Sequence, residues 1–156
     1  MSGQDQQGAQ ASGDELPLAL LLLRASRWFD GHLLEALQAE GWPRLMPAQS
    51  LVFAQLAPGG IAPAELARRL RISRQATQEL VAGLAVQDVL EVVDDPARSR
   101  GRLVRLTPHG RRLTAAARAI LNDLEHQLGD RRSAALRELL TPFASPYESD
   151  PALNTG

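Results

Sequence analysis

The pattern of hydrophobic and polar residues along the chain predicts a fold made mostly of helices. Residues 14–40 carry apolar side chains at helical spacing, with Asp14 placed to cap the start and Gly41 to end the helix. Between residues 18 and 23 apolar side chains surround almost the whole helix, whereas contact with a single core uses one stripe. We therefore expect this helix to bury two faces.

Three shorter helices are expected next, separated by proline and glycine. The first, over residues 47–56, begins at Pro47 and ends at a Pro-Gly-Gly sequence. The other two, over residues 63–70 and about 74–87, are joined by a turn of only three residues, and Ser73 offers a hydroxyl that caps the second. Two helices joined by so short a turn must cross at a steep angle.

The periodicity then changes from helix to strand. Residues 89–93 are rich in β-branched side chains and residues 102–106 alternate polar and apolar side chains, so they predict a hairpin with residues 94–101 as its loop. A long helix over residues 108–128 and a last helix over about residues 131–140 complete the pattern. The expected fold class is mainly α with a small β-hairpin.

The chain is expected to form a single domain over residues 14–141. Residues 1–13 are small and polar and residues 142–156 are rich in Ser, Pro and Asp, so we expect both ends to be disordered. The apolar run at residues 16–23 is short, contains Pro17 and has no Arg or Lys before it. These features argue against a signal peptide or a membrane span and favour a soluble cytoplasmic protein.

Nothing in the sequence indicates catalysis. There is no cysteine, which excludes thiolate zinc sites and cysteine nucleophiles, and there is no glycine-rich phosphate loop or HExxH motif. His32, His109 and His126 lie on three different predicted helices, without the spacing of metal ligands. We therefore expect no catalytic residues, no metal and no cofactor, and we do not expect the protein to be an enzyme.

The net charge of −1 conceals an uneven distribution of charge. Residues 68–118 hold 11 Arg and five acidic residues, whereas both flanking segments are acidic overall. A steeply crossed helix pair can place one helix in the major groove of DNA, which is about 12 Å wide, while a basic hairpin reaches the neighbouring minor groove or backbone. The basic block therefore favours double-stranded DNA as a partner.

Short motifs in a fixed order strengthen this interpretation. They are Glu65-Leu66-Ala67 in the third helix, Ser73-Arg74 at the start of the fourth, Asp95-Pro96 at the entry to the hairpin loop, and Leu103-Val104-Arg105-Leu106-Thr107 followed by Gly110. Together they resemble the MarR (multiple antibiotic resistance regulator) family, over about residues 15–140. The resemblance implies a winged helix-turn-helix transcriptional regulator, with a DNA-binding core over residues 47–107 and dimerisation helices over residues 14–40 and 108–141.

Spacing and resemblance together assign DNA contacts to the fourth helix. Ala76, Leu80 and Leu84 recur every four residues and are expected to face the core. That arrangement leaves the N-terminal end of the helix for DNA, where Arg can pair with guanine and Gln with adenine. The residues expected to bind DNA there are Ser73, Arg74, Gln75, Thr77 and Gln78.

The hairpin is the expected wing, and Arg98, Arg100 and Arg102 are its predicted DNA contacts. Alternation along the hairpin would place all three on one basic edge, suited to the minor groove or to phosphates. The family's wing usually carries an Asp followed by two Arg, whereas this chain has Arg98, Ser99 and Arg100. The assignment by resemblance is therefore firmest at Arg100.

The resemblance further implies a homodimer and a small aromatic ligand. We expect the first and penultimate helices to expose more apolar surface than one domain can cover. Trp28, His32 and Phe53 are assigned to a ligand cleft, with plain core packing as the alternative. The alternative function is a winged-helix protein-interaction module without DNA binding, which Glu79 on the fourth helix would suit.

Overall fold

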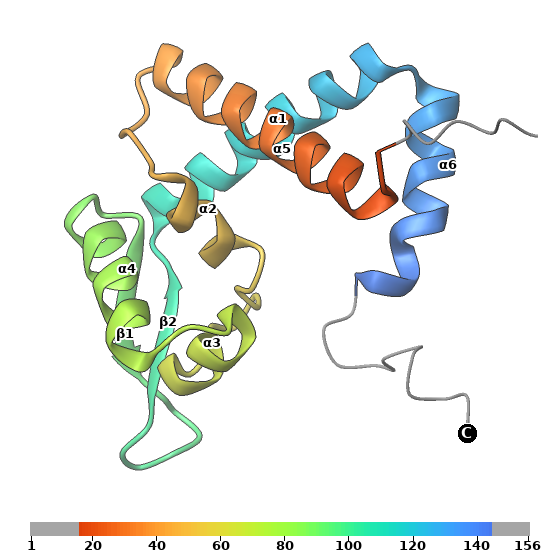
Figure 1. The fold of residues 1–156 in the computed structure, drawn as a ribbon. Helices are drawn as coiled ribbons and strands as arrows, with labels where there is room; N and C mark the ends of the chain where they lie inside the picture. The colour runs from red at the N-terminus through yellow and green to blue at the C-terminus, as the bar shows by residue number, and fades with distance from the viewer. Residues whose placement is uncertain (1–15, 145–156) are drawn as a thin grey trace, which may run out of the picture.

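The structure, a computed structural model, describes residues 16–144 and shows a mainly helical chain with one hairpin (Figure 1). The predicted arm over residues 1–13 and the predicted cap Asp14 lie outside the described residues, as does most of the predicted tail. The described elements are, in chain order, α1 (Leu18–Ala39), α2 (Pro47–Phe53), α3 (Pro63–Leu70), α4 (Arg74–Val86), β1 (Leu90–Asp94), β2 (Arg102–Leu106), α5 (Pro108–Leu128), α6 (Asp130–Leu140) and the short 3-10 helix η1 (Thr141–Phe143). The predicted fold class is confirmed.

Three boundaries differ from the predicted ones. Helix α1 begins only at Leu18, because Pro17 has an extended backbone with φ −52° and ψ 142° and the residue before a proline disfavours helix. Helix α2 ends at Phe53 and passes into a turn, short of the predicted residue 56. The predicted tail does not start at residue 142, since that residue belongs to η1.

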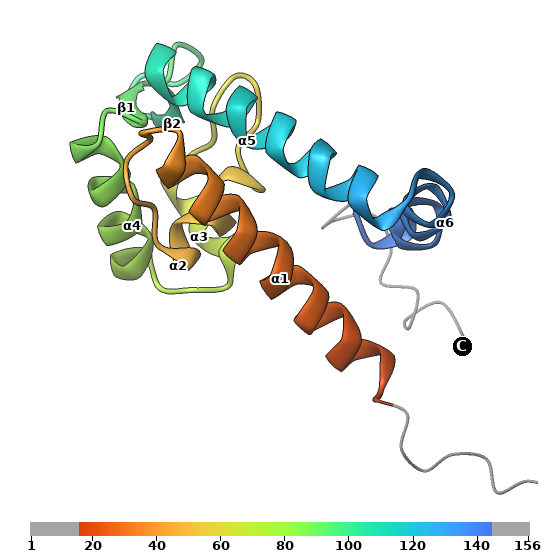
Figure 2. The ribbon, with the colours of Figure 1, turned by 90° about the horizontal axis from the view of Figure 1, so that it is seen from above.

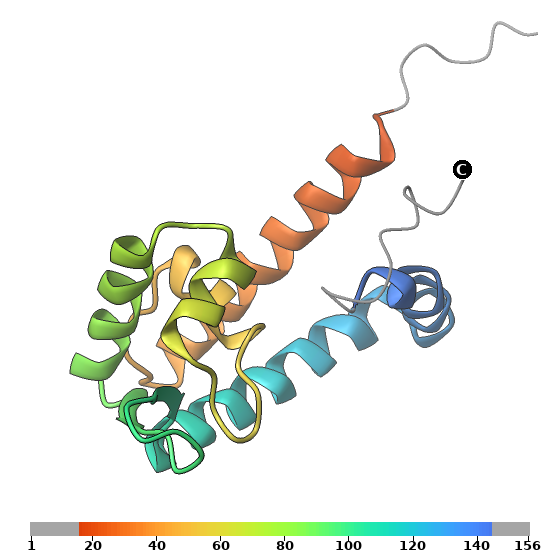
Figure 3. The ribbon, with the colours of Figure 1, turned by 90° about the horizontal axis from the view of Figure 1, so that it is seen from below.

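One core joins α2, α3, α4 and the β1–β2 hairpin to the end of α1 and the start of α5. We call these elements together the winged-helix part. Almost every element of this part supplies a side chain that is essentially inaccessible to solvent. These side chains are Leu37, Val52, Leu66, Leu84, Val89, Leu90, Val104 and Leu113. The beginning of α1 and the end of α5 leave this part in the same direction, and α6 lies at the far end of α5 (Figures 2 and 3).

Strands β1 and β2 pair antiparallel, from Leu90 opposite Leu106 to Asp94 opposite Arg102. The segment between α2 and α3 joins this sheet through Ile61, whose N–H and carbonyl group both bond to Val104, at 2.9 and 2.8 Å. The connection therefore fixes the helix-turn-helix against the wing.

The junction between the wing and α5 explains the Leu-Thr and Gly motifs of the sequence. Thr107 is buried, and its hydroxyl accepts a hydrogen bond from the Gly110 N–H at 2.9 Å. The hydroxyl donates to the Asp88 carbonyl and also lies 3.2 Å from the carbonyl oxygen of Val89. A Cβ at Gly110 would lie 2.0 Å from that same carbonyl oxygen, so only glycine fits. These residues thus set the angle between the hairpin and the long helix.

Apolar side chains are exposed at the far end of the molecule, and α1 exposes them as predicted, at Leu18 and Leu20 to Leu23. The stripe of α5 is covered by its own chain, since Leu113, Ile120 and Leu124 are buried and α5 packs on α1. Of the apolar stripe on α5, only Leu128 at its end is therefore exposed. It is the last helix, α6, that buries none of its residues and exposes Leu136, Leu139 and Leu140.

A groove of about 620 Å³ runs between α1, the end of α5 and α6, and we call it the apolar groove. Its lining is dominated by leucine. The apolar side chains that line it are Leu18, Leu21, Leu22, Ala25, Phe29, Leu128, Leu136, Leu140 and Ala144. Arg137 also lines the groove, and it is ion-paired with Glu125.

Candidate nucleic-acid interface

The start of α4 is built as the sequence predicted. Ser73 has an extended backbone, and its hydroxyl oxygen accepts a hydrogen bond from the Ala76 N–H at 3.0 Å. This cap satisfies one of the free N–H groups of the first turn, and no acidic side chain occupies that turn. The first turn of α4 therefore presents a partial positive charge to its surroundings.

Thr77 is a correction to the predicted set of DNA contacts. Its side chain is 1% exposed, and its hydroxyl donates to the Ser73 carbonyl at 3.0 Å. The buried residues of α4 are Thr77, Val81 and Leu84; of the predicted core face, Leu84 is buried, Leu80 packs partly buried against the core and Ala76 is only partly buried. Thr77 therefore holds α4 in place and does not reach the surface of the helix.

The other predicted side chains of α4 are exposed. Arg74 and Gln78 make no side-chain hydrogen bond or ion pair with the described residues. Gln75 donates to Glu79 across one helical turn, at 3.4 Å. Arg74 and Gln78 thus keep their full hydrogen-bonding capacity, while Gln75 holds the carboxylate of Glu79.

The loop of the hairpin is a compact, hydrogen-bonded turn. Asp95 donates its N–H to the Gly101 carbonyl at 2.8 Å, and its carboxylate accepts from the Ala97 N–H at 2.9 Å. A Cβ at Gly101 would lie 2.8 Å from the Cβ of Asp95 and 2.9 Å from that of Arg98. The loop therefore depends on glycine at position 101 and on an acid at position 95.

Arg98, Arg100 and Arg102 are all exposed, but they do not form one uniform edge. Arg102 lies on β2, where its guanidinium is 3.6 Å from the Asp94 carboxylate and donates to the Val92 carbonyl at 3.3 Å. Arg98 and Arg100 lie in the turn, where strand alternation does not apply, and make no such contact with the described residues. Arg102 is thus engaged within the hairpin, whereas the two loop arginines are not.

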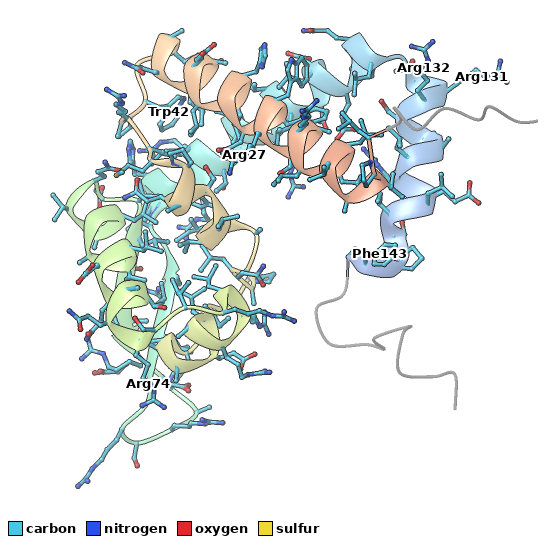
Figure 4. All side chains as sticks on the ribbon, viewed as in Figure 1. Arg27, Trp42, Arg74, Arg131, Arg132 and Phe143 are labelled. Carbon is cyan, nitrogen blue, oxygen red and sulfur yellow. The ribbon has the colours of Figure 1, made fainter. Side chains whose placement is uncertain are left out.

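These elements meet at one end of the molecule. Figure 4 shows Arg74 at the same end as the hairpin loop, whereas Arg131 and Arg132 lie at the opposite end, on α6. The predicted contacts Ser73, Arg74, Gln75 and Gln78 therefore share one end with the loop that carries Arg98 and Arg100.

The supporting helix α3 carries its own charge cluster. The carboxylate of Glu65 accepts hydrogen bonds from Arg68, at 2.7 and 2.8 Å, and from Arg69 at 2.9 Å. These bonds, with that of Arg68 the stronger, hold the pKa of Glu65 below its usual value. Arg71, one turn later, was absent from the predicted set and has no such partner among the described residues.

The three residues assigned to a ligand cleft are not brought together by the contacts that the structure shows. Trp28 is 39% exposed and stacks on His32 with 4.3 Å between ring centres, one turn further along α1. Phe53 is half-buried on α2, against the core. Core packing therefore accounts for Phe53, while Trp28 and His32 form an exposed aromatic pair.

Other kinds of site were sought within residues 16–144. No group of three or more His, Asp or Glu side chains there is arranged to hold a metal ion. None of the helices described has the length and apolar character required to cross a membrane.

Comparison with known proteins gives one family match and a set of similar solved structures. A sequence model of the MarR family matches residues 45–101, which span α2 to the wing, while no curated protein matches the sequence. Among solved structures, wild-type apo MarR from E. coli is 24% identical, with a TM-score of 0.63 over 83% of this chain and 98% of that one.

Two further structures are similar over the same span. A transcriptional regulator of the MarR family from Rhodococcus sp. RHA1 is 25% identical, with a TM-score of 0.64 over 88% of this chain and 98% of that chain. A MarR family protein of Mycobacterium tuberculosis, solved in complex with salicylic acid, is 22% identical, with a TM-score of 0.59 over 85% and 99%. The shared fold therefore includes the long helices as well as the wing.

Proposed function

We propose that this chain is a regulator of the MarR family that binds double-stranded DNA sequence-specifically as a homodimer, because a MarR family model matches residues 45–101 and solved MarR family regulators share its fold. The observation that carries the proposal is the convergence of Arg74, Gln78 and the loop arginines at one end of the molecule, with no partners of their own among the described residues. An unpaired guanidinium at a helix N-terminus suits a guanine edge, and an amide suits adenine.

A gel-shift titration with the DNA upstream of its own gene tests this proposal. Arg74→Ala is expected to weaken specific binding by about 1–3 kcal/mol while leaving binding to random DNA nearly unchanged. Arg132→Ala is the matched control, since Arg132 is also exposed but lies at the opposite end of the molecule. Equal losses on specific and random DNA would make Arg74 a phosphate contact instead.

The alternative, a protein-interaction module, predicts a different result. Glu79 is exposed on α4, where a carboxylate would be repelled by phosphates, but it accepts a hydrogen bond from Gln75. If the wild-type protein is folded and dimeric yet binds neither upstream nor random DNA, the interaction module becomes the better explanation.

The exposed leucines of α1 and α6 support the homodimer. A soluble monomer rarely exposes a continuous apolar patch of this kind, and a two-fold axis would let each copy cover the groove of the other. Sedimentation equilibrium is expected to give a dimer at micromolar concentration, and a monomer there would contradict it.

A small aromatic ligand is part of the proposal. The protein from M. tuberculosis was solved with salicylic acid, and the stacked pair of Trp28 and His32 offers an exposed aromatic surface here. Titration with salicylate is expected to quench tryptophan fluorescence in the wild type and in Trp42→Phe, but not in Trp28→Phe. Quenching that survives in Trp28→Phe would remove Trp28 from the ligand site.

A further inference from the structure

Helices α1, α3 and α4 end in the same hydrogen-bonded turn. In this turn a residue just past the helix adopts the left-handed conformation, and two N–H groups bond back to the last carbonyls. At the end of α1 that residue is Gly41, with φ +87°, its N–H bonded to Gln38 and the N–H of Trp42 bonded to Leu37. Glycine is the usual residue there, because it lacks the Cβ that opposes positive φ.

Helix α3 ends in this turn with an arginine. Arg71 has φ +55° and ψ +38°, its N–H donates to the Arg68 carbonyl at 3.2 Å, and the N–H of Ile72 donates to Ala67 at 3.3 Å. A long side chain at such a position is strained, since only glycine and, less often, Asn and Asp adopt it readily. Glycine at position 71 would close the same turn without that strain.

The backbone of the turn is hydrogen-bonded, but the side chain of Arg71 adds no hydrogen bond or ion pair within the described residues that would offset its strain. Arg68 and Arg69 are held by Glu65, but the Arg71 guanidinium has no hydrogen bond or ion pair there. The favourable interaction of a cation with the end of a helix is already supplied by Arg68 and Arg69, in the last turn of α3. The guanidinium of Arg71 therefore keeps its hydrogen-bonding capacity for a partner outside the described residues.

The place of Arg71 indicates what that is. It ends α3 and lies in the turn that leads into α4, two residues before the capping Ser73 and three before Arg74, the first residue of α4. Helix N-termini attract phosphate, and an arginine beside one can share a phosphate oxygen pair through its planar guanidinium. We propose that Arg71 binds a DNA backbone phosphate beside α4, an inference that rests on the proposed DNA-binding function.

The test combines thermal stability with the salt dependence of DNA binding, using a short duplex of random sequence. Arg71→Gly is expected to raise the melting temperature by about 2–4 °C, because the left-handed strain is relieved. The same change should flatten the slope of log affinity against log salt by about 0.9 for each lost phosphate contact, and so by about 1.8 for a dimer.

Two further variants separate the effect of backbone strain on the melting temperature from the effect of charge on DNA binding. Arg71→Ala keeps the Cβ, so it should flatten the salt slope equally without the gain in melting temperature. Asp88→Gly is the matched control, since Asp88 has φ +56° in the same kind of turn at the far end of α4. It should raise the melting temperature and leave the salt slope unchanged.

The outcomes are distinguishable from a failure of the proposed function. If the wild type binds the duplex and Arg71→Gly keeps its salt slope, Arg71 is not a phosphate contact and the inference is overturned while DNA binding stands. A lower melting temperature in Arg71→Gly would overturn the argument from strain. If the wild type does not bind the duplex at all, the proposed function fails and this inference fails with it.

Discussion

The winged-helix part and the far end around α6 differ in how far their leucine side chains are buried. In the first, leucines from α1, α3, α4, β1 and α5 meet in one core, and the charged side chains point outward. In the second, α6 buries no residue and its leucines border an open groove. The first region buries its leucines within one chain, whereas the second leaves them exposed, as half of the proposed dimer interface would. Each prediction below tests one side of this contrast.

The largest effect on folding is expected in the core of the winged-helix part. Leu84 is inaccessible to solvent, so Leu84→Ala should lower the free energy of unfolding by about 2–5 kcal/mol through lost burial and a cavity. Val86 lies on the same helix but is 89% exposed, and Val86→Ala should change that free energy by at most about 0.5 kcal/mol. Urea denaturation of both variants at one protein concentration measures the difference, and equal losses would show that α4 is not anchored as described.

At the far end the same kind of residue should govern association rather than folding. Leu21 lines the apolar groove, so Leu21→Glu would place a carboxylate in the interface between two copies. The desolvation of that charge should raise the dimer dissociation constant by at least about 100-fold, while the helical circular dichroism stays. Val86→Glu, an exposed change away from the groove, should leave sedimentation unaltered. A dimer that survives Leu21→Glu would place the interface elsewhere.

The contrast also shows what a sequence can and cannot predict. Capping by Ser73, the hairpin and the long helices follow from local rules, and they were predicted from the sequence because those rules involve residues close in the chain. The exposure of Thr77 was predicted wrongly for a physical reason. Steps of four residues drift around a helix of 3.6 residues per turn, and a threonine can be buried when its hydroxyl bonds to the preceding turn.

Long-range contacts decided the remaining differences. The stripe of α5 was visible in the sequence, but its covering by α1 instead of a second chain depends on how two distant helices pack. Arg102 became engaged because the strand register brings Asp94 opposite it. Arg71 gave no signal in the hydrophobic pattern, since a left-handed backbone is a property of the turn as a whole.

Two arginines of the wing differ in whether the guanidinium has a partner among the described residues: Arg102 has one and Arg100 does not. Arg100→Ala should flatten the slope of log affinity against log salt by about 2 in a dimer, with an unchanged melting temperature, because the exposed side chain contributes little to the fold. Arg102→Ala is the matched control, and its slope should change less because its guanidinium is held by Asp94 and Val92. An unaltered slope in Arg100→Ala would mean that the wing does not contact DNA and would favour an interaction module.

The smallest expected effect concerns how α6 is attached to α5. The two helices meet at Gly129, and Nδ1 of His126 lies 2.7 Å from the carboxylate of Asp130 across that junction. This hydrogen bond, together with the negative charge of Asp130, raises the pKa of His126 above its usual value of 6.5. The stabilisation is fully present below the unfolded pKa and is lost as pH rises through the folded one.

Wild-type protein should therefore lose slightly more melting temperature than His126→Gln when the pH is raised from about 6 to about 8. The two proteins differ only at position 126, so the comparison isolates the contribution of His126. Asp130→Asn should behave like His126→Gln, because it removes the carboxylate and leaves the imidazole in place. The difference should be small, since both side chains are largely exposed and solvent screens the pair. If wild type and His126→Gln show the same pH dependence, this pair does not help to attach α6 to α5.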